Sequence, residues 1–163
     1  MDIDKGNQEE LDINVDSLWL IGPRAKGGKR ENNYHGNFVP QIPDQMIRRY
    51  TKKDGIVLDM FMGSGTTLFE AETLGRSYIG FDINDSIIAH VQKKMEGSKI
   101  KYLIHNCDIT NQESISYMLS DDLIKLQDTG VDLIMSHPPY LDIVRFTNKK
   151  EDLSNITDLN TFI

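Results

Sequence analysis

The sequence predicts a doubly wound α/β fold built on one mostly parallel sheet, and two observations predict it. From residue 55 onward, short apolar runs alternate with longer segments whose apolar residues recur at helical spacing. Gly75 and Gly97 follow two of these helical segments, at the position where helices commonly end. Strands that alternate with helices pair in parallel through right-handed crossovers. We therefore expect helices on both faces of a single sheet.

The expected elements follow in order along the chain. Pro43 and Asp44 open a helix over residues 45–50, whose apolar side chains share one face. The apolar runs that indicate strands lie at residues 56–58, 77–81, 100–104 and 131–135. The helices between these strands are expected at residues 66–74, 85–95 and 114–119, the last continuing to 126 if its pattern extends.

Size and composition indicate one ordinary globular domain. The chain has 163 residues, of which 39% are hydrophobic and 26% charged. It contains no apolar stretch near the roughly 18 residues that a membrane span requires. Its first residues are acidic rather than basic and apolar, so we expect no export. The single cysteine, Cys107, excludes an internal disulfide and fits a cytoplasmic protein.

Composition divides the chain into four expected parts. Residues 1–16 are polar and acidic and indicate a flexible lead-in. Residues 17–54 combine a short apolar element, a basic loop rich in glycine and asparagine, and the first helix. The α/β core is expected over residues 55–145, and residues 146–163 form a polar C-terminal tail.

A glycine loop after the first strand indicates a small-molecule site. Gly63 and Gly65 carry no side chains, so the backbone there can approach a ligand closely and adopt positive φ. The N–H groups that open the following helix attract a carboxylate. The loop also carries three hydroxyl groups, those of Ser64, Thr66 and Thr67. It is not a P-loop, which ends in Gly-Lys-Ser/Thr, and Leu68 occupies the third glycine position of the dinucleotide-binding fingerprint.

Acidic residues follow three successive strands, at Asp59, Asp82 and Asp108. The carboxyl ends of parallel strands are where doubly wound folds bind ligands. Asp82 lies about twenty residues after the glycine loop, where an acid accepts both hydrogen bonds of a ribose. Asp108 is placed to accept a hydrogen bond from an adenine amino group. Any one such acid is equally explained as a helix cap, but three in succession favour a ligand site.

The fourth strand runs into the sequence Ser136, His137, Pro138, Pro139 and Tyr140. Proline restricts φ, so consecutive prolines hold a backbone carbonyl in a fixed place. A neutral His137 imidazole offers one acceptor nitrogen, and Tyr140 offers a flat aromatic surface. In isolation such a turn most often only ends a strand. Behind a glycine loop and two strand-end acids, it indicates a reaction centre.

Together the two motifs resemble the S-adenosylmethionine-dependent amino-methyltransferases, which modify the exocyclic amino group of adenine or cytosine in DNA. Phe61, Gly63 and Gly65 match the F-x-G-x-G motif of that family, and residues 61–67 agree with its Phe-x-Gly-Ser-Gly-Thr-Thr form throughout. The resemblance spans about residues 19–140. It implies a Rossmann-like methyltransferase fold, S-adenosylmethionine as the cofactor and DNA as the partner.

The resemblance also implies roles for individual residues. The implied cofactor-binding residues are Pro40, Gln41, Asp59, Phe61, Gly63, Ser64, Gly65, Thr66, Thr67, Asp82, Ile83 and Asp108. Within the segment 17–54, residues 38–43 would cover the methionine end of the cofactor. The implied catalytic residues are Ser136, His137, Pro138, Pro139 and Tyr140.

At the expected reaction centre, two acceptors on the amino hydrogens aim the nitrogen lone pair at the methyl group, and positioning supplies most of the rate. Tyr140 would stack a base that has been flipped out of the duplex. The family usually has Asp, Asn or Ser where this chain has His137. This difference leaves the choice between adenine and cytosine open.

That family has a seven-stranded sheet, and only its first four strands are predicted here. The fourth strand is central in the complete fold, so ending there leaves an apolar edge that invites pairing. We therefore expect a sheet that is incomplete at its C-terminus. A second chain or a missing C-terminal region would supply the remaining strands and the recognition of a target sequence.

The net charge of −7 requires a local basic patch if the protein is to bind DNA phosphates. One candidate patch consists of Arg24, Lys26, Lys29 and Arg30; a solvated surface loop explains it equally well. The histidines show no metal-ligand spacing with one another or with Cys107, so we expect no metal site.

Two other functions stay open at this level. The same chemistry could act on RNA or on a glutamine amide of a protein, because similar Asn-Pro-Pro-Tyr turns serve those nitrogens too. Alternatively, the chain is a non-catalytic, cofactor-binding half that needs a partner chain. DNA ranks first because residues 61–67 have the DNA-type form. A restriction–modification role and a solitary role look identical at this level.

Overall fold

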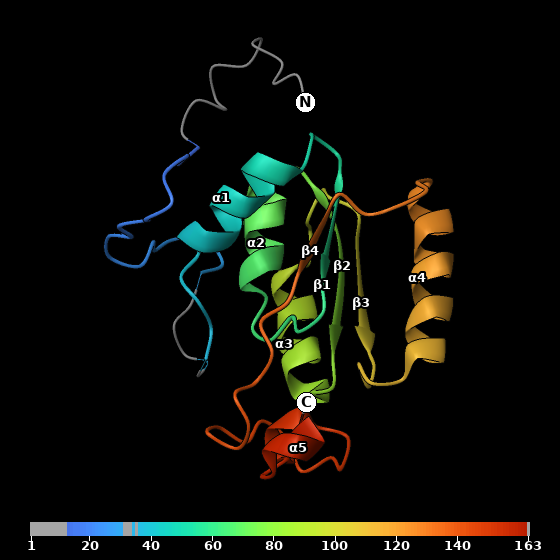
Figure 1. The fold of residues 1–163 in the computed structure, drawn as a ribbon. Helices are drawn as coiled ribbons and strands as arrows, with labels where there is room; N and C mark the ends of the chain where they lie inside the picture. Colours follow the sequence, from blue (N-terminus) through green and yellow to red (C-terminus); the bar gives the residue numbers. More distant parts are fainter. Residues whose placement is uncertain (1–12, 31–33, 35, 163) are drawn as a thin grey trace.

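A parallel four-stranded sheet forms the centre of the molecule (Figure 1). The computed structural model describes residues 13–30, 34 and 36–162. Its strands are β1 (Ile56–Asp59), β2 (Ser77–Asp82), β3 (Tyr102–Asn106) and β4 (Leu133–Met135), in the order β3-β2-β1-β4. All three pairings are parallel, which confirms the predicted α/β class.

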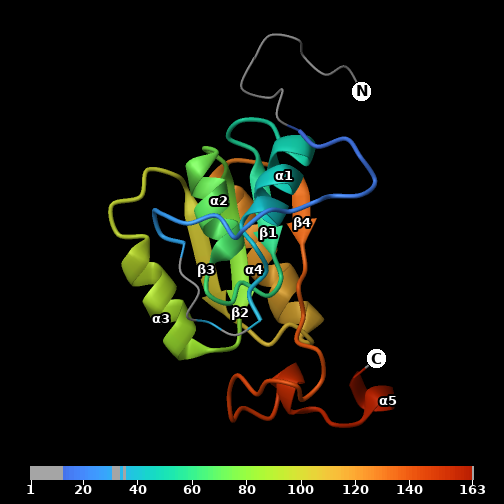
Figure 2. The same ribbon diagram turned by 90° about the vertical axis from the view of Figure 1, so that its left-hand side faces the viewer.

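Helices cover both faces of this sheet (Figures 1 and 2). Three of them, α1 (Gln41–Tyr50), α2 (Thr66–Thr73) and α3 (Asp85–Lys94), lie on one face, and α4 (Gln112–Leu126) lies on the other. The short helix α5 (Leu159–Phe162) lies beyond the carboxyl ends of the strands. None of the helices within the described ranges is long and apolar enough to cross a membrane.

The strands alternate their side chains between two apolar layers, as the twofold period of a strand requires. Val57 of β1 packs with α1, α2 and α3, whereas its neighbours Ile56 and Leu58 face the α4 layer. In β2 the same alternation places Tyr78 on the first face and Phe81 on the second. Every residue of β1 is buried, as expected for a central strand covered on both faces.

A buried polar pair joins the α4 layer to the sheet. Nε2 of His105, on β3, lies 2.6 Å from a carboxylate oxygen of Asp122, on α4. The Asp122 side chain is completely buried. The pair therefore fixes the position of α4 through a directional contact in addition to its apolar packing.

Some boundaries differ from those expected. Helix α1 begins at Gln41, four residues before the expected start, because Pro40 already has helical backbone angles (φ −56°, ψ −27°) and Pro43 is tolerated in a first turn. Strand β3 begins at Tyr102 rather than at residue 100. Helix α4 reaches Leu126, so its pattern does extend.

The N-terminal segment has little regular structure. Residues 17–21, expected as a short apolar element, form neither helix nor strand, and the Leu20 side chain is 88% exposed. Trp19 is half-buried, with the Arg49 guanidinium 5.6 Å from the centre of its ring. The expected flexible lead-in falls mostly on residues 1–12, which lie outside the described residues.

Residues 146–156, expected as part of a polar tail, fold into an ordered loop under the carboxyl ends of the strands. The Phe146 N–H donates to Oγ of Ser154, and the Thr147 hydroxyl donates to Asp152. Asp152 is only 3% exposed and also accepts from the N–H of Ser154. A 3₁₀ turn at Leu153–Asn155 completes the loop.

Within the described residues the sheet ends at β4, whose outer edge pairs with no other strand. Leu133 and Met135 pack against the layer that contains α2. Ile134 points to the opposite face and is 59% exposed, although it lies in the middle of the strand. This edge is therefore apolar and open, as the sequence predicted.

We predict that Leu68→Ala lowers the free energy of unfolding by about 2–5 kcal/mol, because Leu68 of α2 is completely buried against the sheet and its truncation leaves a cavity. The exposed Leu20 is a matched control, and Leu20→Ala should change the stability by less than about 0.5 kcal/mol. Urea unfolding followed by circular dichroism measures both. Equal midpoints for the two variants would contradict the assigned core.

Candidate functional site

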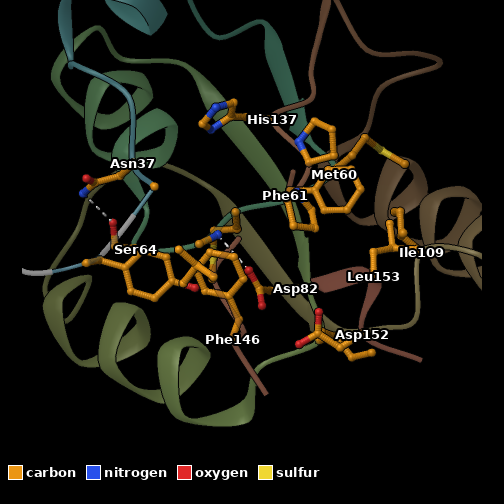
Figure 3. Close-up of a pocket in the computed structure, with 18 of the residues that line it drawn as sticks. Asn37, Met60, Phe61, Ser64, Asp82, Ile109, His137, Phe146, Asp152 and Leu153 are labelled. Atoms are coloured by element: carbon orange, nitrogen blue, oxygen red, sulfur yellow. Dashed lines mark hydrogen bonds between the residues drawn. The ribbon is translucent and has the colours of Figure 1, made fainter. Parts of the chain in front are cut away.

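A cavity opens at the carboxyl ends of β1, β2 and β4, where the glycine loop meets the Pro-Pro-Tyr turn (Figure 3). Its walls come from four parts of the chain: residues 34 and 36–38, residues 60–64 with 66 and 67, the ends of β2 and β3, and residues of the segment between 137 and 153. Parallel strands that diverge around a crossover create such a crevice in doubly wound folds. In the order β3-β2-β1-β4, the direction in which strands are added to the sheet reverses between β1 and β4.

Asp82 anchors the glycine loop at this cavity. One oxygen of its carboxylate accepts from the N–H of Gly63 at 2.7 Å, and the other accepts from the N–H of Asn84 at 2.8 Å. Burial raises the pKa of Asp82, and these backbone hydrogen bonds partly offset that effect. The carboxylate retains lone pairs for hydroxyl donors of a ligand that enters the cavity.

The backbone of the glycine loop explains why glycine occurs twice. Gly63 and Gly65 have φ angles of +51° and +85°, which side-chain-bearing residues rarely adopt. A Cβ at Gly65 would lie 3.0 Å from the ring of Phe69 and 3.2 Å from Val91. A Cβ at Gly63 would lie 3.4 Å from the ring of Tyr34. The positive φ therefore explains the first glycine, and the second also allows α2 to pack against α3.

Asp59 lies beneath the cavity rather than in its wall. Its side chain is 3% exposed, accepts from the Phe61 N–H at 3.1 Å, and accepts from the Tyr78 hydroxyl at 3.2 Å. Burial raises the pKa of Asp59 to about 6, because its hydrogen bonds only partly offset the lost hydration. Its position suits a support for the loop that follows β1.

The Pro-Pro-Tyr turn faces the glycine loop across the cavity. Nε2 of His137 lies 2.8 Å from the Tyr140 hydroxyl, and the Phe38 ring meets the imidazole edge-on at 4.9 Å between centroids. Burial lowers the pKa of His137. The Tyr140 side chain is 62% exposed, so much of its ring remains open to a planar partner.

Eleven of the residues singled out in the sequence line this one cavity: Phe61, Gly63, Ser64, Thr66, Thr67, Asp82, Ile83, His137, Pro138, Pro139 and Tyr140. The glycine loop and the Pro-Pro-Tyr turn are 70 residues apart, from Thr67 to His137, so the fold brings the two motifs together. Figure 3 shows Asp82 and His137 on opposite sides of Phe61. Their assignment to cofactor binding or catalysis stays a prediction.

Six of the singled-out residues lie outside the cavity wall: Pro40, Gln41, Asp59, Gly65, Asp108 and Ser136. Asp108 accepts from both the N–H and the hydroxyl of Thr110, as a capping residue does, while its neighbours Cys107 and Ile109 line the cavity. Gln41 bonds the N-terminal segment, donating to the Pro23 carbonyl at 2.7 Å.

Sequence reasoning missed residues that close the cavity from two sides. The rings of Tyr34 and Phe146 stack with centroids 5.4 Å apart and an interplanar angle of 19°. Asn37 hydrogen-bonds Ser64 at 3.1 Å, and the buried Asp152 comes from the C-terminal loop (Figure 3). An aromatic residue within each polar loop was the only signal in the sequence.

The predicted basic patch is tied into the fold. Arg30 forms a two-pronged ion pair with the fully buried Glu70 of α2, with both nitrogen–oxygen distances 2.6 Å. Lys29 lies 2.6 Å from a carboxylate oxygen of Glu72, two residues after Glu70 in α2. Arg24 donates to the Phe38 carbonyl, and Lys26 is exposed. These contacts position the loop, and a role for it in DNA binding stays a prediction.

No group of three or more His, Cys, Asp or Glu side chains is placed to hold a metal ion in the part of the chain that the structure describes.

A protein-family model described as DNA methylase matches residues 2–93 of the chain. The chain belongs to this DNA methylase family. The match includes the glycine loop and Asp82, the two features that build one side of the cavity. It ends before the Pro-Pro-Tyr turn.

Curated relatives of the chain include type II methyltransferases. M.MjaII of Methanocaldococcus jannaschii is 30% identical over 121 residues, which cover 72% of this chain and 23% of the relative. M.MjaI of the same organism is 32% identical over 89 residues, covering 54% of this chain and 29% of the relative. M.ScaI of Streptomyces caespitosus is 32% identical over 82 residues, covering 48% and 27%. The chain thus spans about a quarter of the length of these relatives.

We predict that Asp59→Asn removes a pH dependence from the stability of this protein. The folded-state pKa of Asp59 is raised from 3.8 to about 6, so the folded protein holds this proton more tightly than the unfolded chain. The protonated Asp59 side chain contributes fully to the stability below pH 4. This contribution falls by up to about 3 kcal/mol as the pH rises to 6, because the unfolded chain loses the proton first. Asparagine cannot titrate and should flatten this decline.

Urea unfolding at half-unit steps between pH 4 and 7 measures the effect. The exposed Asp142 provides a matched control, since Asp142→Asn should leave the decline in place. A decline of the same size in Asp59→Asn would assign the pH dependence to another group.

Proposed function

We propose that this chain binds S-adenosylmethionine and transfers its methyl group to the exocyclic amino group of adenine or cytosine in DNA. The observation that carries the proposal is the meeting of a glycine loop, a buried strand-end acid and a Pro-Pro-Tyr turn in one cavity. Membership of the DNA methylase family and likeness to type II methyltransferases support it. We also propose a role in restriction–modification, which the same likeness supports, and a cytoplasmic location.

The residues present fit the cofactor. Asp82, with both oxygens already oriented by backbone N–H groups, can accept hydrogen bonds from the ribose hydroxyls. Apolar walls at Ile83, Cys107 and Ile109 suit the faces of an adenine ring. Hydroxyl groups at the start of α2 and the side chain of Asn37 suit the charged methionine end. When bound, the cofactor supplies an electrophilic methyl group on a sulfonium.

The Pro-Pro-Tyr turn would hold the acceptor nitrogen. The amino group of a nucleobase is a weak nucleophile, because its lone pair is delocalised into the ring. A backbone carbonyl of the turn and the His137 imidazole can accept its two hydrogens and reorient that lone pair. The half-exposed ring of Tyr140 would stack the extruded base, offsetting a few kcal/mol of unstacking cost.

We propose that recognition of a target sequence lies in a part of the enzyme that pairs with the outer edge of β4. The open apolar edge at Ile134 suits pairing with a further strand. We propose that either a second chain or C-terminal residues of the same protein supply this strand and the contacts to a DNA sequence. Methyl transfer by the chain alone is therefore expected to be slower than transfer by a completed assembly.

Calorimetric titration of S-adenosylmethionine tests the cofactor site. We predict that Asp82→Ala weakens binding at least about 10-fold, the cost of losing a hydrogen-bonding charge. Asp142→Ala, which removes an exposed acid, should bind as the wild type does. Near-UV circular dichroism of each variant verifies that it is folded.

A folded wild-type chain without measurable binding would contradict the proposal.

A second experiment identifies the substrate of a chain that does bind the cofactor. Transfer of a radiolabelled methyl group is measured with duplex DNA, RNA and a glutamine-containing peptide offered separately. Labelling of RNA or of the peptide in preference to DNA would replace the proposed substrate but keep the cofactor site.

A further inference from the structure

An imidazole stands at the proposed reaction centre and is held on two sides. His137 leads directly into the Pro-Pro-Tyr turn and lines the cavity. Its Nε2 lies 2.8 Å from the Tyr140 hydroxyl, and the Phe38 ring packs edge-on against it. The Nε2 atom is thus engaged within the turn, and Nδ1 is the other ring nitrogen that can act as an acceptor.

Methyl transfer to an amino group creates a proton that must leave. The nitrogen lone pair forms the new N–C bond, while the C–S bond breaks and its electrons stay on sulfur. The methylated nitrogen then carries a positive charge and one proton too many. That N–H bond breaks, its electrons return to nitrogen, and the proton passes to an acceptor. An amide or a hydroxyl can accept a hydrogen bond at this position, whereas an imidazole can also take the proton from the far more acidic methylated nitrogen and release it to water near neutral pH.

We propose that His137 takes this proton through Nδ1, while its Nε2–H donates to the Tyr140 hydroxyl. In this arrangement Tyr140 is a positioning residue that selects the tautomer, as the third member of a nucleophile–base–orienter set does. The proposal rests on the proposed function and adds a catalytic proton transfer to it.

The surroundings suit a neutral imidazole before the reaction. Burial lowers the pKa of His137 below its usual value near 6.5, so the ring is unprotonated at neutral pH. The titratable group in contact with it is Tyr140, and Phe38 brings no charge. The other titratable residues that line the cavity are Tyr34, Asp82, Cys107, Glu151 and Asp152. The base is therefore competent above its own pKa, and the rate should fall as the pH drops through that value.

Nitrogen NMR of the full chain labelled at histidine tests the tautomer without any turnover. The expected spectrum at pH 7.5 shows the His137 Nε2 protonated and Nδ1 carrying a lone pair. Tyr140→Phe should reduce the preference for this tautomer, because the phenylalanine ring has no hydroxyl to accept from the His137 Nε2–H. A wild-type protein with Nδ1 protonated would overturn the proposal, since Tyr140 would then occupy the only acceptor.

Single-turnover methylation of duplex DNA between pH 5 and 9 tests the proton transfer. The wild-type rate should fall tenfold per unit of pH below the His137 pKa and should slow in heavy water. His137→Asn keeps a hydrogen-bond acceptor but no base, and we expect its rate at pH 8 to drop about 100-fold and to lose the acidic decline. A His137→Asn rate within about twofold of the wild type, with the same pH profile, would overturn the proposal.

The two levels of the hypothesis fail differently. If the wild-type chain transfers no methyl group at any pH, even with the further strand proposed above supplied, the proposed function fails and takes this step with it. If the wild type is active but indifferent to His137→Asn, only the proton transfer fails.

Discussion

The hydrogen bonds that the Asp82 carboxylate accepts from Gly63 and Asn84 are the constraint on which the rest of the site depends. They hold the glycine loop against the end of β2 and set where α2 begins. The loop in turn leaves room for the Tyr34 ring, and Asn84 donates to the Phe146 carbonyl at 3.3 Å. A single carboxylate therefore organises both walls of the cavity. Its burial has an electrostatic cost, and hydroxyl donors on a ligand would offset that cost by hydrogen-bonding the same oxygens.

The C-terminal loop is joined to this centre through charge as well as aromatic stacking. Lys149 donates to the Ile83 carbonyl at 2.7 Å and lies 2.6 Å from a carboxylate oxygen of Asp85. Its ammonium thus reaches the segment that follows Asp82 and partly balances the acids gathered there. Because residues 146–156 are bonded to the loop after β2, a ligand at Asp82 and the order of the C-terminal loop are physically coupled.

How far the sequence predicts the structure depends on the range of the interactions. The central strands and Asp82 could be predicted, because burial on both faces leaves an unbroken apolar run and the spacing from Gly63 to Asp82 follows from one strand–helix–strand unit. The orientation of Asp108 could not, since capping and ligand binding require the same residue type. Phe146 was missed because Asn84, which hydrogen-bonds its carbonyl, lies 62 residues away in the chain. The ion pair of Arg30 was missed because nothing in the sequence indicates that Glu70, inside a helix, is buried.

The strand order has a consequence for how the site assembles in time. Strand β1 pairs with β2 across a short crossover, whereas the N–H of Ile56 reaches Asp132 of the segment leading into β4 over a separation of 76 residues. Closing that long loop costs more chain entropy, and such non-local pairings tend to form late. During synthesis the glycine loop and Asp82 leave the ribosome before β4 does. The half that carries the glycine loop and Asp82 is thus ready to form first, and the Pro-Pro-Tyr turn is added to it as β4 docks.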